Sequence, residues 1–338
     1  MYSSKPLHSA GDAGEFPRRQ LLLGGVATAL MASLPPTLRA AAKDNGPLIS
    51  KRIPSGGQRL ATIGIGGNSI ISMDQYETVR AVLARMHEMG GQMIDTSDNY
   101  GEGEAVIGRA LAELGIREQM FVATKFDSEN VTAVARQRGR IAGREAFDRS
   151  LSRLQSDYVD LLYAHAVASA EPLMPLMREL KAAGKARYIG MTAAEGNDRT
   201  LIVEEMRKYP VDFIQVDYSI GNRLAEQAIL PLAQERRMAV VAVRPLGGHT
   251  QAPGGHEGSY LSKLGSRPLP PWAAEAGAAS WSQFLLKYVI SHPAVTCAAA
   301  GTTVVAHMED NQLAGHGKLP DAGMRRKMQE YWSTLGIT

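Results

Sequence analysis

Several features that would assign this 338-residue chain to a particular class of protein are scarce. It has one cysteine, Cys297, so no disulfide can form within the chain. That residue lies in the apolar stretch 294–301, which predicts a small buried side chain. The net charge is only +3, and a nucleic-acid surface needs clustered lysine and arginine, so we expect no nucleic-acid partner. We also predict no metal site.

The composition that remains is that of a globular protein. Hydrophobic residues make up 44% of the chain and charged residues 21%, which is enough apolar material for a full-sized core. The length fits one large domain or two ordinary ones, because single α/β barrels often reach about 250 residues. The order of the predicted strands and helices along the chain distinguishes one domain from two.

Residues 1–42 differ in kind from the rest of the chain. Arg18 and Arg19 precede an uncharged apolar stretch from Leu21 to Leu34, and small residues follow at 40–42. This order is typical of an export signal, and the stretch is too short to span a bilayer as a helix. The paired arginines resemble a bacterial twin-arginine leader. We therefore expect recognition by export machinery and a periplasmic location, or a cytoplasmic one if the leader does not function.

From residue 50 onward, short apolar runs alternate with amphipathic helical patterns. Eight runs are strand candidates. They are Ala61–Gly66, Gln92–Asp95, Phe121–Lys125, Tyr158–Ala164, Ala186–Met191, Phe213–Val216, Ala239–Val243 and Val295–Ala299.

Strands that are apolar on both faces and alternate with helices indicate a parallel sheet covered by helices. Eight such units predict a single (β/α)8 TIM barrel over residues 50–338. A doubly wound sheet is less favoured, because no G-x-G-x-x-G turn follows the first strand. Residues 50–64 predict an N-terminal β-hairpin that plugs the barrel floor, and Gly323–Leu335 predicts an extra C-terminal helix.

One long stretch, Gly247–Pro271, has no regular period and is rich in glycine and proline. We predict a loop with a short helical turn at Tyr260–Leu264. Loops of this length are usually functional or disordered. Tyr260 and Trp272 are candidates either to line a substrate pocket or to pack in the core.

Polar residues follow three consecutive predicted strands. Asp95 ends the second strand, Lys125 ends the third, His165 follows the fourth, and Tyr100 lies on the loop that leaves the second. In a TIM barrel the carboxyl ends of the strands meet at one mouth, so these side chains are predicted to converge there. Each has an ordinary alternative, such as a turn cap, a packed ring or a core histidine.

Lys125 is the hardest of these residues to explain by structure alone. It follows an apolar run, and a buried ammonium is costly unless it is paired, so Asp95 is its predicted counter-charge. A phenol is a poor acid near neutral pH unless a nearby cation favours the phenolate. Lys125 would supply that cation to Tyr100, and His165 would donate a hydrogen bond to a developing oxyanion. The set suits the reduction of a carbonyl, with the hydride coming from a nicotinamide cofactor.

From about residue 50 the chain resembles the aldo-keto reductase family. The resemblance rests on the motifs DTSDNYGEGEAVIGRAL, ATKF, YVDLLYAHA, GKARYIGMT, DFIQVDYS, VVAVRPLGG and AGTTVVAHMEDN, in this order along the chain. It implies a catalytic tetrad of Asp95, Tyr100, Lys125 and His165, with Tyr100 as the general acid. It also implies a small-molecule carbonyl substrate.

The resemblance also assigns cofactor positions. The family holds the nicotinamide carboxamide with a serine, an asparagine and a glutamine; here Gln215 matches, Thr192 replaces the serine and Ala193 replaces the asparagine. Val243 stands where an aromatic ring commonly stacks on the nicotinamide, and Arg244 follows it. The predicted cofactor-binding residues are Thr192, Gln215, Arg244, Leu246, Gly301, Thr302, His307, Asp310 and Asn311. NADPH is the favoured cofactor and NADH is not excluded, because basic residues for a 2′-phosphate are few.

We therefore expect a reductase that converts an aldehyde or ketone to an alcohol. One alternative is a nicotinamide-binding redox sensor or partner subunit with little turnover. A second is an unrelated barrel chemistry, such as an aldolase that forms a Schiff base on Lys125. A monomer is the default expectation, since no symmetric apolar patch is evident in the sequence.

Overall fold

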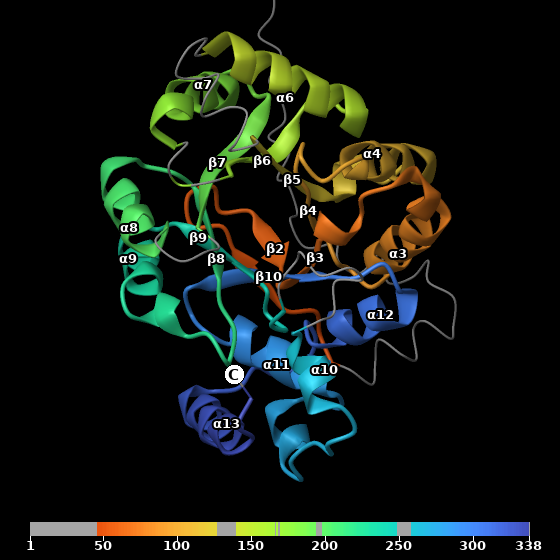
Figure 1. Ribbon diagram of the computed structural model, residues 1–338, viewed down its shortest axis with the longest axis vertical. Helices are drawn as coiled ribbons and strands as arrows, with labels where there is room; N and C mark the ends of the chain where they lie inside the picture. The colour runs from red at the N-terminus through yellow and green to blue at the C-terminus, as the bar shows by residue number, and fades with distance from the viewer. Residues whose placement is uncertain are drawn as a thin grey trace, which may run out of the picture. The chain divides into compact units, whose positions relative to one another are not determined.

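Eight strands form a closed parallel barrel in the part of the chain that the structure describes (Figure 1). The structure is a computed structural model and describes residues 46–126, 140–165, 167, 170–193, 198–248 and 258–337. The predicted leader at 1–42 lies outside these residues. Around the barrel the strand order is β10-β3-β4-β5-β6-β7-β8-β9, and β9 pairs with β10 to close it. The strands are β3 (Ile63–Gly66), β4 (Met93–Asp95), β5 (Phe121–Phe126), β6 (Val159–Ala164), β7 (Ala186–Ala193), β8 (Phe213–Asp217), β9 (Ala239–Val243) and β10 (Val295–Gly301).

The predicted barrel and all eight predicted strands are confirmed, with six of the strands differing by one or two residues at one end and one run needing a larger correction. The first predicted run, Ala61–Gly66, is divided between two elements. Ala61 ends the hairpin strand β2, and the barrel strand β3 begins at Ile63. The break falls at Thr62, whose backbone N–H donates to Ile49 O at 3.2 Å instead of joining the barrel ladder.

Helices surround the barrel, as Figure 1 shows. The α-helices are α3 (Tyr76–Glu88), α4 (Gly103–Leu114), α6 (Arg140–Leu154), α7 (Ala170–Ala182), α8 (Asp198–Lys208), α9 (Ile229–Glu235), α10 (Tyr260–Leu264), α11 (Trp281–Ile290), α12 (Val305–Leu313) and α13 (Ala322–Thr334). Short 3₁₀ turns are η2 (Gly67–Ser69), η3 (Met73–Gln75), η4 (Arg117–Gln119), η6 (Leu224–Glu226) and η7 (Ala273–Ala276). Among the described helices none is both long and apolar enough to cross a bilayer.

The predicted hairpin is confirmed and closes the barrel floor. Strands β1 (Ser50–Arg52) and β2 (Arg59–Ala61) pair antiparallel. Ile53 and Leu60 are fully buried and belong to the apolar cluster that also contains the inward-facing residues of the barrel strands. The turn uses Gly57 at φ +75°, in the left-handed region where glycine is favoured.

Two apolar cores sit on the two sides of the barrel wall. The larger one lies between the strands and the helices, and the smaller one fills the barrel. In the smaller core the Phe121 ring lies 5.8 Å from Phe213 and 6.0 Å from Tyr188 between centroids. The predicted burial of Cys297 is confirmed, because it lies in this interior cluster with no exposed surface. The packed interior makes the strand ends the place where polar groups reach solvent.

The predicted C-terminal helix α13 is confirmed. Its contacts show whether Tyr260 and Trp272 line a pocket or pack in the core. Tyr260 is buried, and its ring lies 4.8 Å from that of Trp332 on α13. Trp272 packs edge-on against Tyr331 at 5.7 Å. Both are therefore packing residues that fix the C-terminal helix, and the idea that they line a substrate pocket is not supported.

Candidate active site

Three neighbouring strands present ionisable side chains at their carboxyl ends. Asp95 is the last residue of β4, Lys125 the penultimate residue of β5, and His165 follows β6 directly. These strands pair in the order β4-β5-β6, with Lys125 opposite Tyr163. The convergence that the strand-end argument predicts is therefore present. Residues 127–139, 166, 168–169, 194–197 and 249–257 lie outside the described residues, so we define the site by the described side chains alone.

Lys125 and Asp95 form a buried ion pair at the centre of the group. Lys125 Nζ donates to Asp95 Oδ2 at 2.7 Å and to the carbonyl oxygen of Thr96 at 2.7 Å. The two residues are 2% and 4% exposed. Burial opposes the charge on Lys125, but the interactions with Asp95 and Tyr100 outweigh it and raise the pKa above its ordinary value. The lysine is thus a permanent cation at neutral pH.

The ring of Tyr100 lies beside this cation. Lys125 Nζ is 5.0 Å from the ring centroid, and the His165 ring lies 6.0 Å away at an interplanar angle of 78°. The loop that places Tyr100 turns through Gly101, at φ +56°, where a Cβ atom would lie 2.5 Å from the carbonyl oxygen of Ile71. Only glycine fits that turn, so the loop conformation is fixed by the sequence at this point.

His165 is held as a neutral imidazole. Burial first, and the charge of Lys125 second, lower the pKa of His165 from 6.5 to about 3. Its Nδ1 lies 3.3 Å from Ser97 Oγ, and its backbone carbonyl accepts a hydrogen bond from Thr192 Oγ1. When the Ser97 hydroxyl donates to Nδ1, the ring hydrogen is on Nε2 and is available to a ligand oxygen.

Gln215, a predicted carboxamide ligand, joins the same group. Its Nε2 donates to Asp95 Oδ1 at 2.9 Å, so both oxygens of Asp95 are engaged. Thr192, on the adjacent strand β7, pairs with Gln215 in the sheet register. The structure therefore brings these two predicted cofactor residues into contact with the predicted tetrad.

The other predicted cofactor residues come from the ends of β9 and β10. Arg244 follows β9 at φ +53° and pairs with Asp217 at 3.6 Å. Leu246 is half-buried against the outer core. Val243 also packs against the barrel interior, so it offers no flat ring at this position.

The β10 end meets the end of β3. Gly301, the last residue of β10, pairs with Gly66, and a Cβ atom at Gly301 would lie 3.2 Å from Asn68 Oδ1. Ser69 Oγ is buried here without a hydrogen-bond partner in the described residues. An unpartnered hydroxyl beside exposed glycine backbone fits a polar ligand group, such as a phosphate, at this edge.

Asp310 and Asn311 are already engaged with the start of α11. Asp310 accepts hydrogen bonds from Ser280 Oγ and from Gln283 Nε2, both at 2.7 Å. Asn311 is 5% exposed, and its Oδ1 accepts a hydrogen bond from Ser282 Oγ. His307 is exposed on α12, and Thr302 is buried at the turn before it. Asp310 and Asn311 thus contact α11 and the serine before it.

Three residues of the candidate site were not identified from the sequence. Ser97 contacts His165, and Asn68 and Ser69 line the β3 end beside Gly301. The sequence features that could have indicated them are two short polar runs: TSDN, directly after Asp95, and GGNS, which begins at the last residue of β3. In the described residues no group of three or more His, Cys, Asp and Glu side chains is placed to hold a metal ion.

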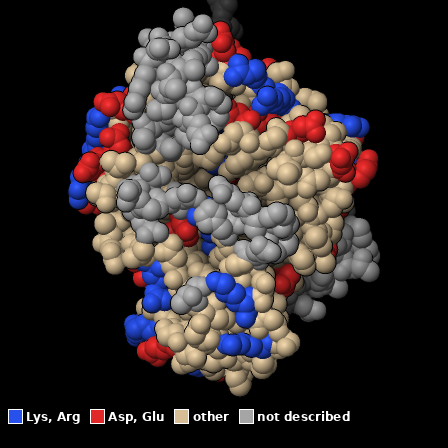
Figure 2. Space-filling view, in the orientation of Figure 1, with Lys and Arg blue, Asp and Glu red and all other residues tan. Residues whose placement is uncertain are grey.

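The face shown in Figure 2 has acidic and basic groups interspersed over a largely uncharged surface. Near its centre, acidic and basic atoms lie close together. The described surface of this face therefore carries charges of both signs, which fits a small-molecule site better than a polyanion track.

Comparison with known proteins gives consistent matches. A family model described as "Aldo/keto reductase family" matches residues 62–329. The chain is 33% identical over 199 residues to aldo-keto reductase YhdN of Bacillus subtilis, a match that covers 54% of this chain and 56% of that protein. It is 30% identical over 272 residues to methylglyoxal reductase YeaE of Escherichia coli, covering 78% and 88%. The aligned part thus spans little more than half of the first relative and most of the second.

A solved structure agrees on the architecture. The crystal structure of an aldo-keto reductase from Klebsiella pneumoniae in complex with NADPH superimposes with a TM-score of 0.63 at 23% identity. The match covers 85% of this chain and 96% of that one. At this identity the likeness establishes the barrel fold.

Proposed function

Because the chain belongs to the aldo/keto reductase family, we propose that it reduces a small aldehyde or ketone to an alcohol with NADPH. The observation that carries the proposal is the buried pair of Lys125 and Asp95, with Lys125 Nζ 5.0 Å from the ring centroid of Tyr100. A barrel without this chemistry has no need to hold a charged lysine beside a phenol, since burying the pair costs solvation energy.

Tyr100 acts as the proton donor in this proposal. As hydride reaches the carbonyl carbon, the carbonyl oxygen gains negative charge and takes the phenolic proton, which gives the alcohol. The tyrosinate left behind is stabilised by the Lys125 cation, and Asp95 keeps that cation charged and in place. Solvent then returns a proton to Tyr100.

His165 orients and polarises the carbonyl. A neutral imidazole with its hydrogen on Nε2 donates to the substrate oxygen without competing with Tyr100 as an acid. The pKa of about 3 keeps the ring neutral throughout the physiological range. Ser97, at 3.3 Å from Nδ1, supports this tautomer.

A bound nicotinamide ring would supply the hydride, which no side chain of the group can provide. Thr192 and Gln215 would hold its carboxamide, and Arg244 and Leu246 would lie along the cofactor. Gly301, Thr302, His307, Asp310 and Asn311 would hold the adenosine end, with Ser69 as an added phosphate ligand. NADPH is preferred over NADH because a solved relative binds it.

The test is NADPH oxidation by the purified chain with a panel of small carbonyls. Methylglyoxal heads the panel, because one relative is named for its reduction. Carbonyl-dependent loss of NADPH absorbance over many turnovers, with one alcohol formed per NADPH, supports the proposal. Tight NADPH binding without turnover on any carbonyl would instead favour the redox-sensor alternative. Borohydride trapping of substrate on Lys125 would favour a Schiff-base reaction.

We further propose that the chain is exported as a monomer through its twin-arginine-type leader. The paired arginines before the apolar stretch Leu21–Leu34 motivate this. Twin-arginine export carries folded proteins, so the cofactor would be bound before transit.

A further inference from the structure

A second pocket lies at the opposite ends of the barrel strands from the candidate active site. It has a volume of about 430 Å³ and is bounded by the hairpin β1–β2 and by the starts of β9 and β10. Met238 stands directly before β9, and Thr296 is the second residue of β10. We call it the floor pocket, because the catalytic side chains lie at the other ends of the strands.

The floor pocket is basic and contains no acidic residue. Four of its lining residues, Lys51, Arg52, Arg59 and Arg237, carry positive charge, and none of the others is Asp or Glu. Within the described part of the chain, no ion pair joins any of the four to a carboxylate. Each positive charge is therefore without a counter-ion in this pocket, which is costly when several lie together.

The side chains are held in place by neutral oxygens. Lys51 Nζ donates to the carbonyl oxygens of Ile290, His292 and Val295 at 2.7, 2.9 and 2.6 Å, so all its hydrogens are used. Burial, and next the charge of Arg325, lower the pKa of Lys51 to about 8. A cation destabilised in this way gains from an anion placed nearby.

The arginine side chains of the floor pocket make few hydrogen bonds. Arg59 Nε donates to Ser50 Oγ at 2.8 Å, and Arg237 donates to the carbonyl oxygen of Pro54 at 3.3 Å. The side chain of Arg52 makes no hydrogen bond or ion pair with the described residues. Most guanidinium hydrogens of Arg52 and Arg237 thus remain available at the pocket surface.

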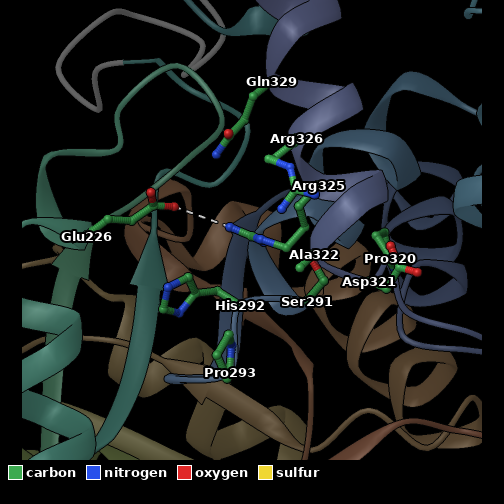
Figure 3. A pocket seen from close by; sticks show the side chains of 10 residues that line it. All are labelled: Glu226, Ser291, His292, Pro293, Pro320, Asp321, Ala322, Arg325, Arg326 and Gln329. Atoms are coloured by element: carbon green, nitrogen blue, oxygen red, sulfur yellow. Dashed lines mark hydrogen bonds and ion pairs between the residues drawn. The ribbon is translucent and has the colours of Figure 1, made fainter.

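A neighbouring pocket provides an internal comparison. It has a volume of about 360 Å³ and contains Arg325 and Arg326, but also Glu226 and Asp321 (Figure 3). Arg325 pairs with Glu226 at 3.2 Å, the interaction drawn as a dashed line. Carboxylates therefore stand beside the arginines of this pocket, whereas no described Asp or Glu lines the floor pocket.

We propose that the floor pocket binds a small phosphorylated molecule. Guanidinium groups match phosphate oxygens in pairs, which favours a multiply charged oxyanion over a single carboxylate. Pro293, which is exposed at the pocket, offers apolar surface to an uncharged organic part. The volume lies within the range of about 300–1,000 Å³ that is typical of small-ligand sites. This proposal does not depend on the proposed reduction.

The test uses the full-length chain and inorganic pyrophosphate as the probe. Binding is measured by calorimetry at constant ionic strength with saturating NADPH, so that the cofactor's own phosphate contacts are occupied. We expect Arg52→Gln/Arg237→Gln to weaken pyrophosphate binding by at least about tenfold. Arg326→Gln, which removes a charge from the neighbouring pocket, is the matched control and should change binding by less than about twofold.

Three results would overturn the proposal. They are no binding of pyrophosphate to the unaltered chain, unchanged binding by the double variant, and an equal loss in Arg326→Gln. A second variant, Arg52→Lys/Arg237→Lys, keeps the charge and removes the paired geometry, and it should bind with intermediate affinity while folding normally. Sedimentation with phosphatidylglycerol vesicles in the absence of pyrophosphate binding would instead make the surface a membrane contact and overturn the small-molecule assignment.

Discussion

Gln215 Nε2 donates a hydrogen bond to Asp95 Oδ1 at 2.9 Å, which ties a predicted cofactor ligand directly to the carboxylate that holds Lys125. The amide oxygen of Gln215 has no partner among the described side chains, so in the proposed complex it would accept a hydrogen bond from the carboxamide. In the proposed mechanism, Gln215 would therefore both hold the cofactor and fix the carboxylate that pairs with Lys125. The proposal thus implies that the cofactor and Tyr100 are positioned together.

Replacing Gln215 by alanine tests that link. The variant loses a contact to the carboxamide and a hydrogen bond to Asp95, so we expect NADPH to bind about tenfold more weakly and kcat to fall as well. The control is Gln92→Ala, since Gln92 precedes β4 and contacts Ala61 on the hairpin. Fluorescence titration and steady-state kinetics measure the two effects. A loss confined to NADPH affinity, with kcat unchanged, would show that the bond to Asp95 has no role in turnover.

The buried pair predicts a large and non-additive effect on stability. Asp95→Asn leaves the Lys125 ammonium buried without a counter-charge, which we expect to lower the free energy of unfolding by about 3–5 kcal/mol. The double variant Asp95→Asn/Lys125→Met should lose less than the sum of the two single variants, because no lone charge remains. Urea unfolding measures each value.

An exposed pair gives the control for this cycle. Arg144 and Glu179 are both more than 40% exposed, so Arg144→Ala should cost less than about 1 kcal/mol. Equal losses from the exposed and the buried pair would contradict the account of Lys125.

The neutral state of His165 predicts a pH-dependent stability. Its folded pKa of about 3 lies below the unfolded value of about 6.5, so between these values the unfolded chain binds a proton that the folded chain does not. The contribution of His165 is therefore complete above pH 6.5 and is lost as the pH falls towards 3. The free energy of unfolding should therefore decrease as the pH falls from 6 to 4. In His165→Gln this decrease should be smaller, by about 1.4 kcal/mol per pH unit.

Urea unfolding of both proteins at several pH values measures the difference. Between pH 7.5 and 8.5 the two slopes should agree, which serves as the internal control. Identical slopes between pH 6 and 4 would mean that His165 is protonated in the folded chain.

The barrel was predictable from the sequence because its strands are apolar on both faces. The run Phe121–Lys125, for example, does not alternate between apolar and polar residues, and it ends in a lysine. The sequence therefore indicates both a buried strand and a polar residue at its end. Spacing by one strand-helix unit then places Asp95, Lys125 and His165 at one mouth. These inferences rest on local patterns and one general rule of barrel geometry.

Contacts that depend on sheet register were not predictable. Gln215 and Asp95 are 120 residues apart, and only closure of the barrel brings them together. The partners of Asp310 on the first turn of α11 likewise depend on how two helices pack. The floor pocket combines the hairpin with the starts of β9 and β10, so the grouping of its four basic residues appears only in three dimensions.

The predicted leader implies a periplasmic location that depends on Arg18 and Arg19. Arg18→Lys/Arg19→Lys should keep the chain in the cytoplasm, because twin-arginine recognition distinguishes the paired arginines from lysines. Cell fractionation with immunoblotting measures the distribution. The same chain with Arg39→Lys is the control and should still reach the periplasm. Unchanged export of the double variant would refute the twin-arginine route.

The most direct test of the account is the turnover of Tyr100→Phe, which keeps the ring beside Lys125 and removes only the phenolic hydroxyl. We expect kcat for carbonyl reduction to fall by about 10²–10⁴-fold while the Kd for NADPH changes by less than about threefold. Reduction of the carbonyl panel at the rate of the unaltered chain would contradict the role of Tyr100 as the proton donor.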